Sequence, residues 1–233
     1  MSSTGDATGT PAPLHRNLRS VESAAVAGVV YSVLTVVALV LLRRFPDLDG
    51  SDEELTAWFD QGGHRGELIL GLNLAAVGSI AFLWFVAVIR RRLGDREDQF
   101  FATVFLGSAI VYVSIWLVGA ALLAAPAAAL LVDDAASVTS GTASLTRGFA
   151  SALMLVVGPR IQAVFLFSSA TLIRRTDRLP DWLAYLGYAA GVILFTVPLV
   201  SDPVGIGLPL WVFIVSVRML VDRSGRHQSE ETS

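Results

Sequence analysis

The chain has 233 residues, of which 54% are hydrophobic and only 16% are charged, and its mean hydropathy is +0.63. A soluble domain carries about 25% charged residues, so this composition argues against an ordinary soluble fold and indicates membrane-spanning helices. The net charge of −3 argues against a nucleic-acid partner, and the absence of cysteine excludes disulfides, thiolate nucleophiles and cysteine-held metal sites.

The amino-terminal segment predicts a tail followed by a first transmembrane helix. Residues 1–20 are polar and contain Pro11 and Pro13, which is typical of a disordered segment. The first span is predicted at about residues 23–42. Its apolar run is longer than the core of a cleaved signal peptide and ends at Arg43-Arg44, so we expect the helix to be retained.

The acidic loop after the first span predicts a short surface helix. Ser51 stands three residues before Glu54, which is the spacing of a capping box. Leu55, Trp58 and Phe59 then form an apolar edge at helical spacing. We expect this helix to lie on the outer surface with Trp58 at the membrane interface.

Further spans follow, each near the roughly 17–25 residues that cross a bilayer. They are predicted at about residues 68–89, 100–124, 149–173, 182–200 and 204–221, inside a transmembrane domain at 21–222, and residues 223–233 are predicted as a second disordered tail. The last span is the weakest, because it contains Pro209 and ends near Arg218. The loop at 125–148 is rich in alanine, serine and threonine and predicts part helix and part flexible chain.

Arginine, which supplies all 17 basic residues, predicts that both termini are cytoplasmic, because it concentrates in the segments that this orientation leaves inside. The inner segments contain Arg16, Arg19, Arg90, Arg91, Arg92, Arg96, Arg174, Arg175, Arg178, Arg218, Arg223 and Arg226. The outer segments contain Arg43, Arg44, Arg65 and Arg147. The predicted fold is therefore all-α, an integral bundle of six transmembrane helices in a bacterial cytoplasmic membrane.

Arg160 raises the main functional question of the sequence. It lies in an apolar run between Arg147 and Arg174, about 20 Å along a helix from each. This position is near the bilayer midplane. A guanidinium there costs at least about 2.5 kcal/mol, so something must solvate it.

Three interpretations of Arg160 remain open. In the first, its guanidinium repairs the backbone break that Pro159 makes in the helix, or bonds a polar neighbour. Those neighbours are Asn73, Gln162 and Ser114. In the second, it binds an anionic ligand or a lipid phosphate, and Arg160, Asn73 and Gln162 are the candidate ligand-binding residues. In the third, it pairs with an acidic residue of another subunit.

Other polar and small residues in the spans have structural explanations. Asn73 is expected to hydrogen-bond a neighbouring helix, and Glu67, just outside the second span, to stay near water. Gly187 and Gly191 form a small-xxx-small surface that lets helix backbones approach. This surface predicts packing within the bundle or, alternatively, a homo- or hetero-oligomer.

Several chemistries lack their usual residues in this sequence. The histidines, His15, His64 and His227, lie outside the predicted spans, which argues against a membrane haem. The predicted spans contain no mid-depth carboxylate, and no protease or hydrolase motif is present. Asp133-Asp134 is expected to be solvated. We therefore predict no catalytic residue, no metal site and no cofactor.

The run Leu-Pro-Asp-Trp-Leu at residues 179–183 follows an arginine-rich turn and leads into the glycine-spaced fifth span. It resembles a run in uncharacterised bacterial six-span membrane proteins that are grouped only as a domain of unknown function. The resemblance implies the fold and the membrane location, and it transfers no catalytic residue.

Two functions fit these observations. The first is a non-enzymatic membrane module that binds a lipid, a small amphiphile or a protein partner, with Arg160 as its polar contact. The second is a small transporter or channel subunit in which Arg160 contacts an anionic substrate. Transport predicts a polar cavity that reaches Arg160. Lipid binding predicts a lateral groove with an interfacial arginine, such as Arg92 or Arg174, at its mouth, and a structural role predicts a closed bundle with carbonyls or Asn73 within hydrogen-bond reach.

Overall fold

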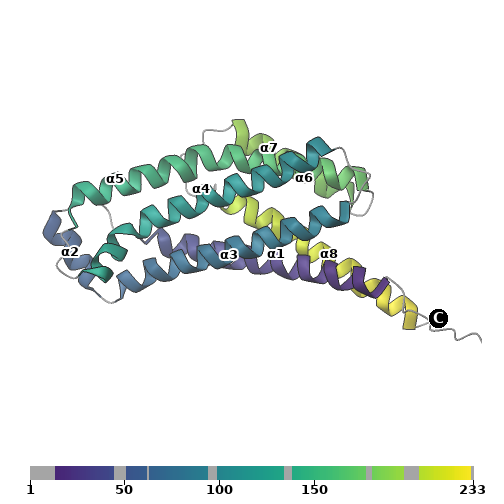
Figure 1. Ribbon diagram of the computed structural model, residues 1–233, viewed down its shortest axis with the longest axis horizontal. Helices are drawn as coiled ribbons and strands as arrows, with labels where there is room; N and C mark the ends of the chain where they lie inside the picture. The colour runs from purple at the N-terminus through teal and green to yellow at the C-terminus, as the bar shows by residue number, and fades with distance from the viewer. Residues whose placement is uncertain are drawn as a thin grey trace, which may run out of the picture.

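The computed structural model describes residues 14–44, 51–61, 63–93, 99–133, 138–176, 180–196 and 205–231, which form helices and connecting turns. The helices are α1 (Leu14–Leu42), α2 (Asp52–Asp60), α3 (His64–Leu93), α4 (Gln99–Val132), α5 (Ser140–Ser151), the π-helical turn η2 (Ala152–Val157), α6 (Gly158–Thr176), α7 (Asp181–Thr196) and α8 (Gly207–Glu231). Helices α5 and α6 join through η2 into one long helix (Figure 1).

The expected all-α architecture with several candidate membrane spans is confirmed. Four helices are long and apolar enough to cross a bilayer, and two shorter apolar helices follow them in the sequence. The long ones are Ser23–Leu42, His64–Arg90, Phe100–Val132 and Ser140–Arg175, and the shorter ones are Asp181–Thr196 and Gly207–Val221. A helix of the length of α7 rises about 24 Å, less than a hydrocarbon core of about 30 Å. The structure therefore gives full length to four of the six predicted spans.

Several helices extend beyond their predicted limits. Helix α4 continues through Pro126 to Val132, and α5 begins at Ser140, so the predicted loop at 125–148 is helical at both ends. The cap that starts α5 is Thr139, whose hydroxyl accepts the N–H of Thr142.

Helical backbone also reaches into both predicted tails. Helix α1 begins at Leu14 and α8 continues to Glu231, inside the segments 1–20 and 223–233. Neither helical stretch contains a proline between these ends and the adjoining span, so nothing in the chain stops the helix. The last residues of the predicted fifth span, 197–200, lie outside the described residues.

The helices pack in an order that differs from their order in the chain. Helix α8 packs on α1, α1 on α3, α3 on α4, α4 on α6, and α6 on α7. The pairs α3–α4 and α6–α7 are helical hairpins of consecutive helices. Helices α7 and α8 follow one another in the chain, yet they touch little. The last helix is therefore held mainly by the first.

Helix α2 lies across one end of the bundle, opposite the carboxyl-terminal end of α8 (Figure 1). It has the predicted capping box, because Ser51 and Glu54 exchange hydrogen bonds between side chain and backbone. Its residues Leu55 and Phe59 are buried, and the ring of Trp58 stacks on that of His64 with the ring centroids 4.2 Å apart. The predicted short surface helix is confirmed.

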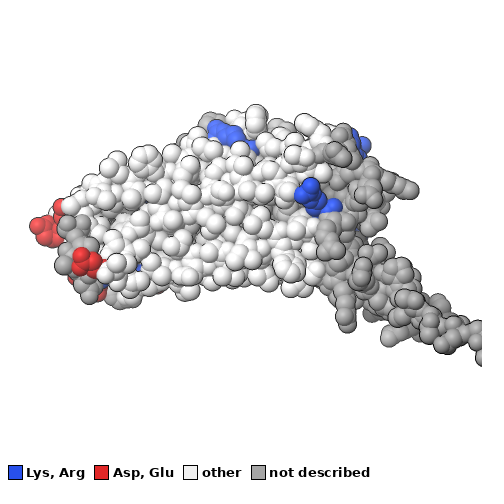
Figure 2. All heavy atoms as spheres, viewed as in Figure 1, with Lys and Arg blue, Asp and Glu red and all other residues white. Residues whose placement is uncertain are grey.

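Charge gathers mainly at the ends of the molecule and leaves a broad, largely uncharged belt between them. Figure 2 shows the acidic side chains at the α2 end and white surface along most of the length of the helices. Arg44 and Glu67 form an ion pair of 2.9 Å at the α2 end. Glu67 is thus shallow, as expected. The belt is the surface that hydrocarbon would cover.

Rings from α1, α3, α4, α6 and α8 meet at the middle of the bundle, and we call them the aromatic centre. They are Tyr31, Phe82, Tyr112, Phe165 and Trp211, all at most 4% exposed. The centroid of Phe82 lies 4.6 Å from that of Tyr31, 5.7 Å from Tyr112 and 5.2 Å from Phe165. These contacts place the five side chains at one level along the bundle. Each aromatic pair contributes about 0.5–1.5 kcal/mol beyond its buried area.

Close helix packing predicts unequal effects of two glycine substitutions. A Cβ on Gly28 of α1 would lie 2.0 Å from Ser216 Oγ of α8 and 2.9 Å from a ring carbon of Phe85. A Cβ on Gly107 of α4 would meet no atom within 4 Å. We expect Gly28→Ala to lower the free energy of unfolding by about 1–3 kcal/mol. The control, Gly107→Ala, should leave it unchanged or raise it by up to about 1 kcal/mol. Equal losses in detergent unfolding curves would contradict this packing.

The link between α2 and α5 predicts a pH dependence. Hydrogen bonds from the side chain of Ser140 and from its backbone N–H, which the Asp52 carboxylate accepts at 2.7 Å, lower the pKa of Asp52. Its stabilising effect is therefore complete above the unfolded pKa of about 3.9 and is lost as the pH falls through the folded value. We expect Asp52→Asn to speed amide hydrogen exchange at Ser140 at pH 7, measured by mass spectrometry. The difference from wild type should vanish as the pH falls through the folded pKa of Asp52, which lies below its ordinary value, and a difference that persists in acid would contradict the assignment.

Candidate functional site

A cavity of about 210 Å³ lies between α1, α4 and the long α5–η2–α6 helix, and we call it the interhelical cavity. From α1 and α4 it is lined by Leu39, Leu42, Arg43, Tyr112, Ile115, Trp116 and Leu123; from the long helix by Arg147, Ala150, Ser151, Met154, Leu155, Gly158 and Gln162; and before α8 by Gly205. Helix α4 rises about 16 Å from Tyr112 to Leu123. The cavity therefore runs from the aromatic centre toward the α2 end.

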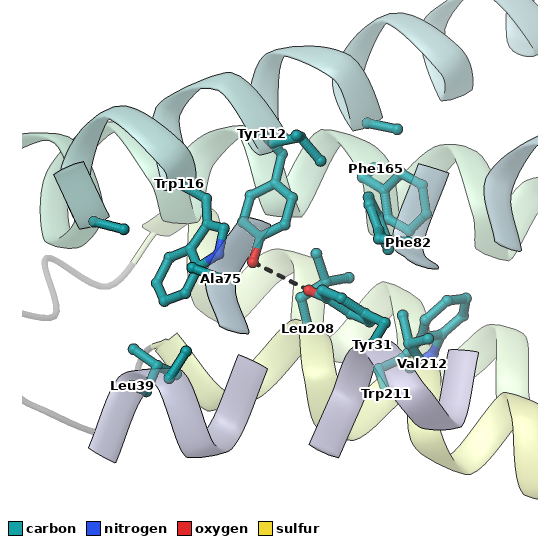
Figure 3. Close-up of a cluster of buried hydrophobic side chains, with 14 of the residues drawn as sticks. Tyr31, Leu39, Ala75, Phe82, Tyr112, Trp116, Phe165, Leu208, Trp211 and Val212 are labelled. Carbon is teal, nitrogen blue, oxygen red and sulfur yellow. Dashed lines mark hydrogen bonds between the residues drawn. The ribbon is translucent and has the colours of Figure 1, made fainter. Parts of the chain in front are cut away.

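Polar groups from α1, α4 and α6 form the deep end of the cavity. The hydroxyls of Tyr31 and Tyr112 lie 3.1 Å apart, as the dashed line in Figure 3 shows. The Tyr112 hydroxyl also hydrogen-bonds with the side chain of Gln162. Gln162 is only 4% exposed. The middle of an otherwise apolar bundle thus contains a connected polar chain.

Two buried polar atoms in the cavity lining lack a hydrogen-bond partner among the described residues. They are Oε1 of Gln162, an acceptor, and Nε1 of Trp116, a donor. Figure 3 shows Trp116 next to Tyr112, with its indole nitrogen on the Tyr112 side. Each unsatisfied buried group costs about 1–3 kcal/mol. A hydroxyl group of a guest molecule, or water, can donate to the amide oxygen and accept from the indole N–H.

The end of the cavity nearest α2 carries two guanidinium groups. Arg43 follows the last turn of α1, and Arg147 lies in α5. Both also make interactions elsewhere. These arginines line the cavity, whereas Arg174, named from the sequence, does not, and the side chain of Arg92 lies outside the described residues. The remaining wall is mostly apolar, so the arrangement suits a guest with a polar or anionic group and an apolar body.

The π-helical turn η2 accommodates Pro159 in a helix that does not break. The N–H of Gly158 bonds the carbonyl of Leu153, five residues earlier, and the guanidinium of Arg160 donates to the carbonyl of Val156. This supports the interpretation in which Arg160 satisfies a carbonyl near the proline. The turn also carries cavity-lining residues, and π turns often occur at functional sites.

The structure does not bring the three predicted ligand-binding residues together. Gln162 lines the cavity, Arg160 is partly exposed on α6 outside it, and Asn73 is exposed on α3. Asn73 donates to the carbonyl of Ile69 in its own helix at 2.8 Å, so the expected bond to a neighbouring helix was wrong. A short amide on an apolar surface finds its nearest acceptor one turn earlier in the same helix.

Sequence reasoning missed most of the cavity lining. Arg43 and Arg147 were interpreted only as topology signals, and Trp116 was not singled out. The one available signal was the presence of Tyr31 and Tyr112 inside predicted spans, because a tyrosine hydroxyl in hydrocarbon needs a partner.

Gly187 and Gly191 pack within the chain. A Cβ on Gly187 would lie 3.2 Å from both Ala170 Cβ and Trp211 Nε1, and one on Gly191 would lie 2.7 Å from the ring of Phe167. Both glycines are buried. An oligomer contact would therefore need a different surface.

Comparison with protein-family models, with curated proteins and with solved structures finds no match to this chain. The resemblance based on residues 179–183 stays a prediction.

Proposed function

We propose that this chain is a six-span protein of a bacterial cytoplasmic membrane, with both termini cytoplasmic, and that its interhelical cavity binds a small amphiphile. The four long apolar helices support a multi-pass membrane protein. Helices α7 and α8 complete the six spans in this proposal. The distribution of arginine supports the orientation.

The observation that carries the binding proposal is the pair of unpartnered polar atoms, Gln162 Oε1 and Trp116 Nε1, in one cavity. A molecule that both donates and accepts hydrogen bonds pairs with the two together. Leu39 and Leu42 offer apolar wall for its body, and the arginines at the α2 end attract an anionic group. At about 210 Å³ the cavity is smaller than the roughly 300–1,000 Å³ of drug-sized sites, which favours a small ligand.

The lining groups favour binding over catalysis, because they are apolar or serve as hydrogen-bond donors and acceptors. The alternative function is a transporter or channel subunit, which requires a polar cavity in which Arg160 contacts the substrate. The interhelical cavity is lined by other residues, so that version has less support than a binding module.

We expect the purified protein to retain a small amphiphile through the two unpartnered atoms. The double variant Gln162→Leu/Trp116→Phe removes both polar atoms and places apolar side chains at the two positions. We expect it to co-purify with about tenfold less of the bound molecule than the wild type does. The matched control Arg160→Ala, outside the cavity, should retain it. Mass spectrometry of co-purified molecules measures this. An empty wild-type protein, or an equal amount in the double variant, would contradict the proposal.

The proposed orientation is testable because the chain has no cysteine to give background labelling. Single cysteines at Ser51 and Ser137 should react with a membrane-impermeant maleimide on intact cells. Those at Gly94 and Thr176 should react only after the membrane is permeabilised. Labelling of the Gly94 variant from outside would overturn the orientation and would leave the cavity proposal standing.

A further inference from the structure

Arg160 presents its guanidinium on the outer surface of the bundle. Its side chain is partly exposed, and the adjacent Val156 and Val157 are 50% and 42% exposed. Its hydrogen bond goes to the Val156 carbonyl one turn earlier. A guanidinium has five N–H donors, so within the described part of the chain most of its donors have no partner.

The depth of Arg160 follows from the helix contacts. It lies two residues from Gln162, which meets Tyr112 at the aromatic centre. Arg174 lies about 18 Å farther along the same helix, and Arg43 lies about 18 Å beyond Tyr31 on α1, in the opposite direction. Arg160 is therefore near mid-depth. Lipid phosphates lie beyond a hydrocarbon half-thickness of about 15 Å, which is longer than an arginine side chain.

Helix α7 ends near the level of Arg160. It runs antiparallel to α6, with Gly187 against Ala170 and Gly191 against Phe167. This register puts Thr196, the last residue of α7, near the level of Gln162. Past that level no part of α7 covers the face of α6 that carries Arg160.

The carboxylates whose side chains the structure describes lie at or beside helix ends. They are Asp52, Glu53, Glu54, Asp60, Glu67, Asp133 and Asp181. Figure 2 shows the acidic surface at the α2 end, away from the middle of the belt. A second copy of this chain therefore brings no described carboxylate to the level of Arg160.

We propose that the surface formed by Val156, Val157 and Arg160 docks a transmembrane helix of another membrane protein that carries an aspartate or glutamate at mid-depth. A lone charge in hydrocarbon is costly, and an ion pair in low dielectric is strong. The planar fork of arginine also matches a carboxylate with two hydrogen bonds. This docking surface is separate from the interhelical cavity, so either proposal can fail without the other.

The test uses the full chain in phosphatidylcholine vesicles and a synthetic polyleucine transmembrane helix with one central aspartate. A fluorophore on a Ser51→Cys variant reports association by energy transfer. We expect the aspartate helix to bind about tenfold tighter than an all-leucine helix. Arg160→Leu should remove that advantage, and Arg160→Lys should retain part of it because the charge remains.

Disulfide crosslinking locates the contact. A cysteine next to the aspartate of the helix should crosslink to Val157→Cys and should fail to crosslink to Val77→Cys. Val77 is the matched control, because it is 52% exposed on α3, five residues from Phe82 of the aromatic centre. Equal crosslinking at both positions would overturn the proposal.

Three further outcomes would also overturn it. The first is equal affinity of the chain for the aspartate helix and the leucine helix. The second is loss of aspartate-helix binding when about a fifth of the lipid is anionic, because anionic lipid would then be the occupant of the site. The third concerns Asp202, which lies in the segment 197–204 outside the described residues. Tighter binding of the aspartate helix by Asp202→Asn would identify the chain's own carboxylate as the partner of Arg160. Unchanged binding supports the proposal.

Discussion

The arrangement of the helices depends on the contacts of one fully buried ring, that of Phe82. It touches Tyr31, Tyr112 and Phe165, and so joins α3 to α1, α4 and α6 at one level. Lipid tails are as apolar as leucine, so helices in a membrane associate through close packing and hydrogen bonds more than through the hydrophobic effect. The same level brings the tyrosine hydroxyls and Gln162 into one polar chain. If Phe82 were small, that chain would lose its alignment.

The π-helical turn before Pro159 has consequences on both sides of the long helix. On the inside, Met154, Leu155 and Gly158 line the cavity that opens beyond the aromatic centre. On the outside, Arg160 reaches back to a carbonyl and leaves most of its donors facing the belt. Pro159 therefore lies in the chain between a residue of the cavity wall, Gly158, and the exposed charge of Arg160. The two proposed contacts, one for a small amphiphile and one for a partner helix, therefore share one local irregularity of the backbone.

Helices α1 and α2 differ in how much of their structure could be predicted from the sequence. The capping box of Ser51 and Glu54 was predictable because its hydrogen bonds form within one turn. On α1, by contrast, Val30 and Val37 face outward while Tyr31 and Ala38 are buried. All of these residues are apolar or nearly so, and both the bundle interior and an apolar outer surface accept such side chains. Hydrophobic periodicity, which identifies the buried face of a helix in water, loses its meaning when the other face meets lipid.

The lengths of the apolar runs and the distribution of arginine follow from chemistry that acts within a segment. They were enough to predict an all-α protein with several candidate membrane spans and to locate most of its helices. The rotation of each helix and its level against its neighbours come from contacts between distant segments. Those contacts decided that Gln162 faces inward beside Trp116 and that Arg160, two residues away on the same helix, faces outward. Two residues apart on an α-helix differ by about 160° in direction, so a small difference in position along the chain places one side chain in the cavity and the other on the outer surface.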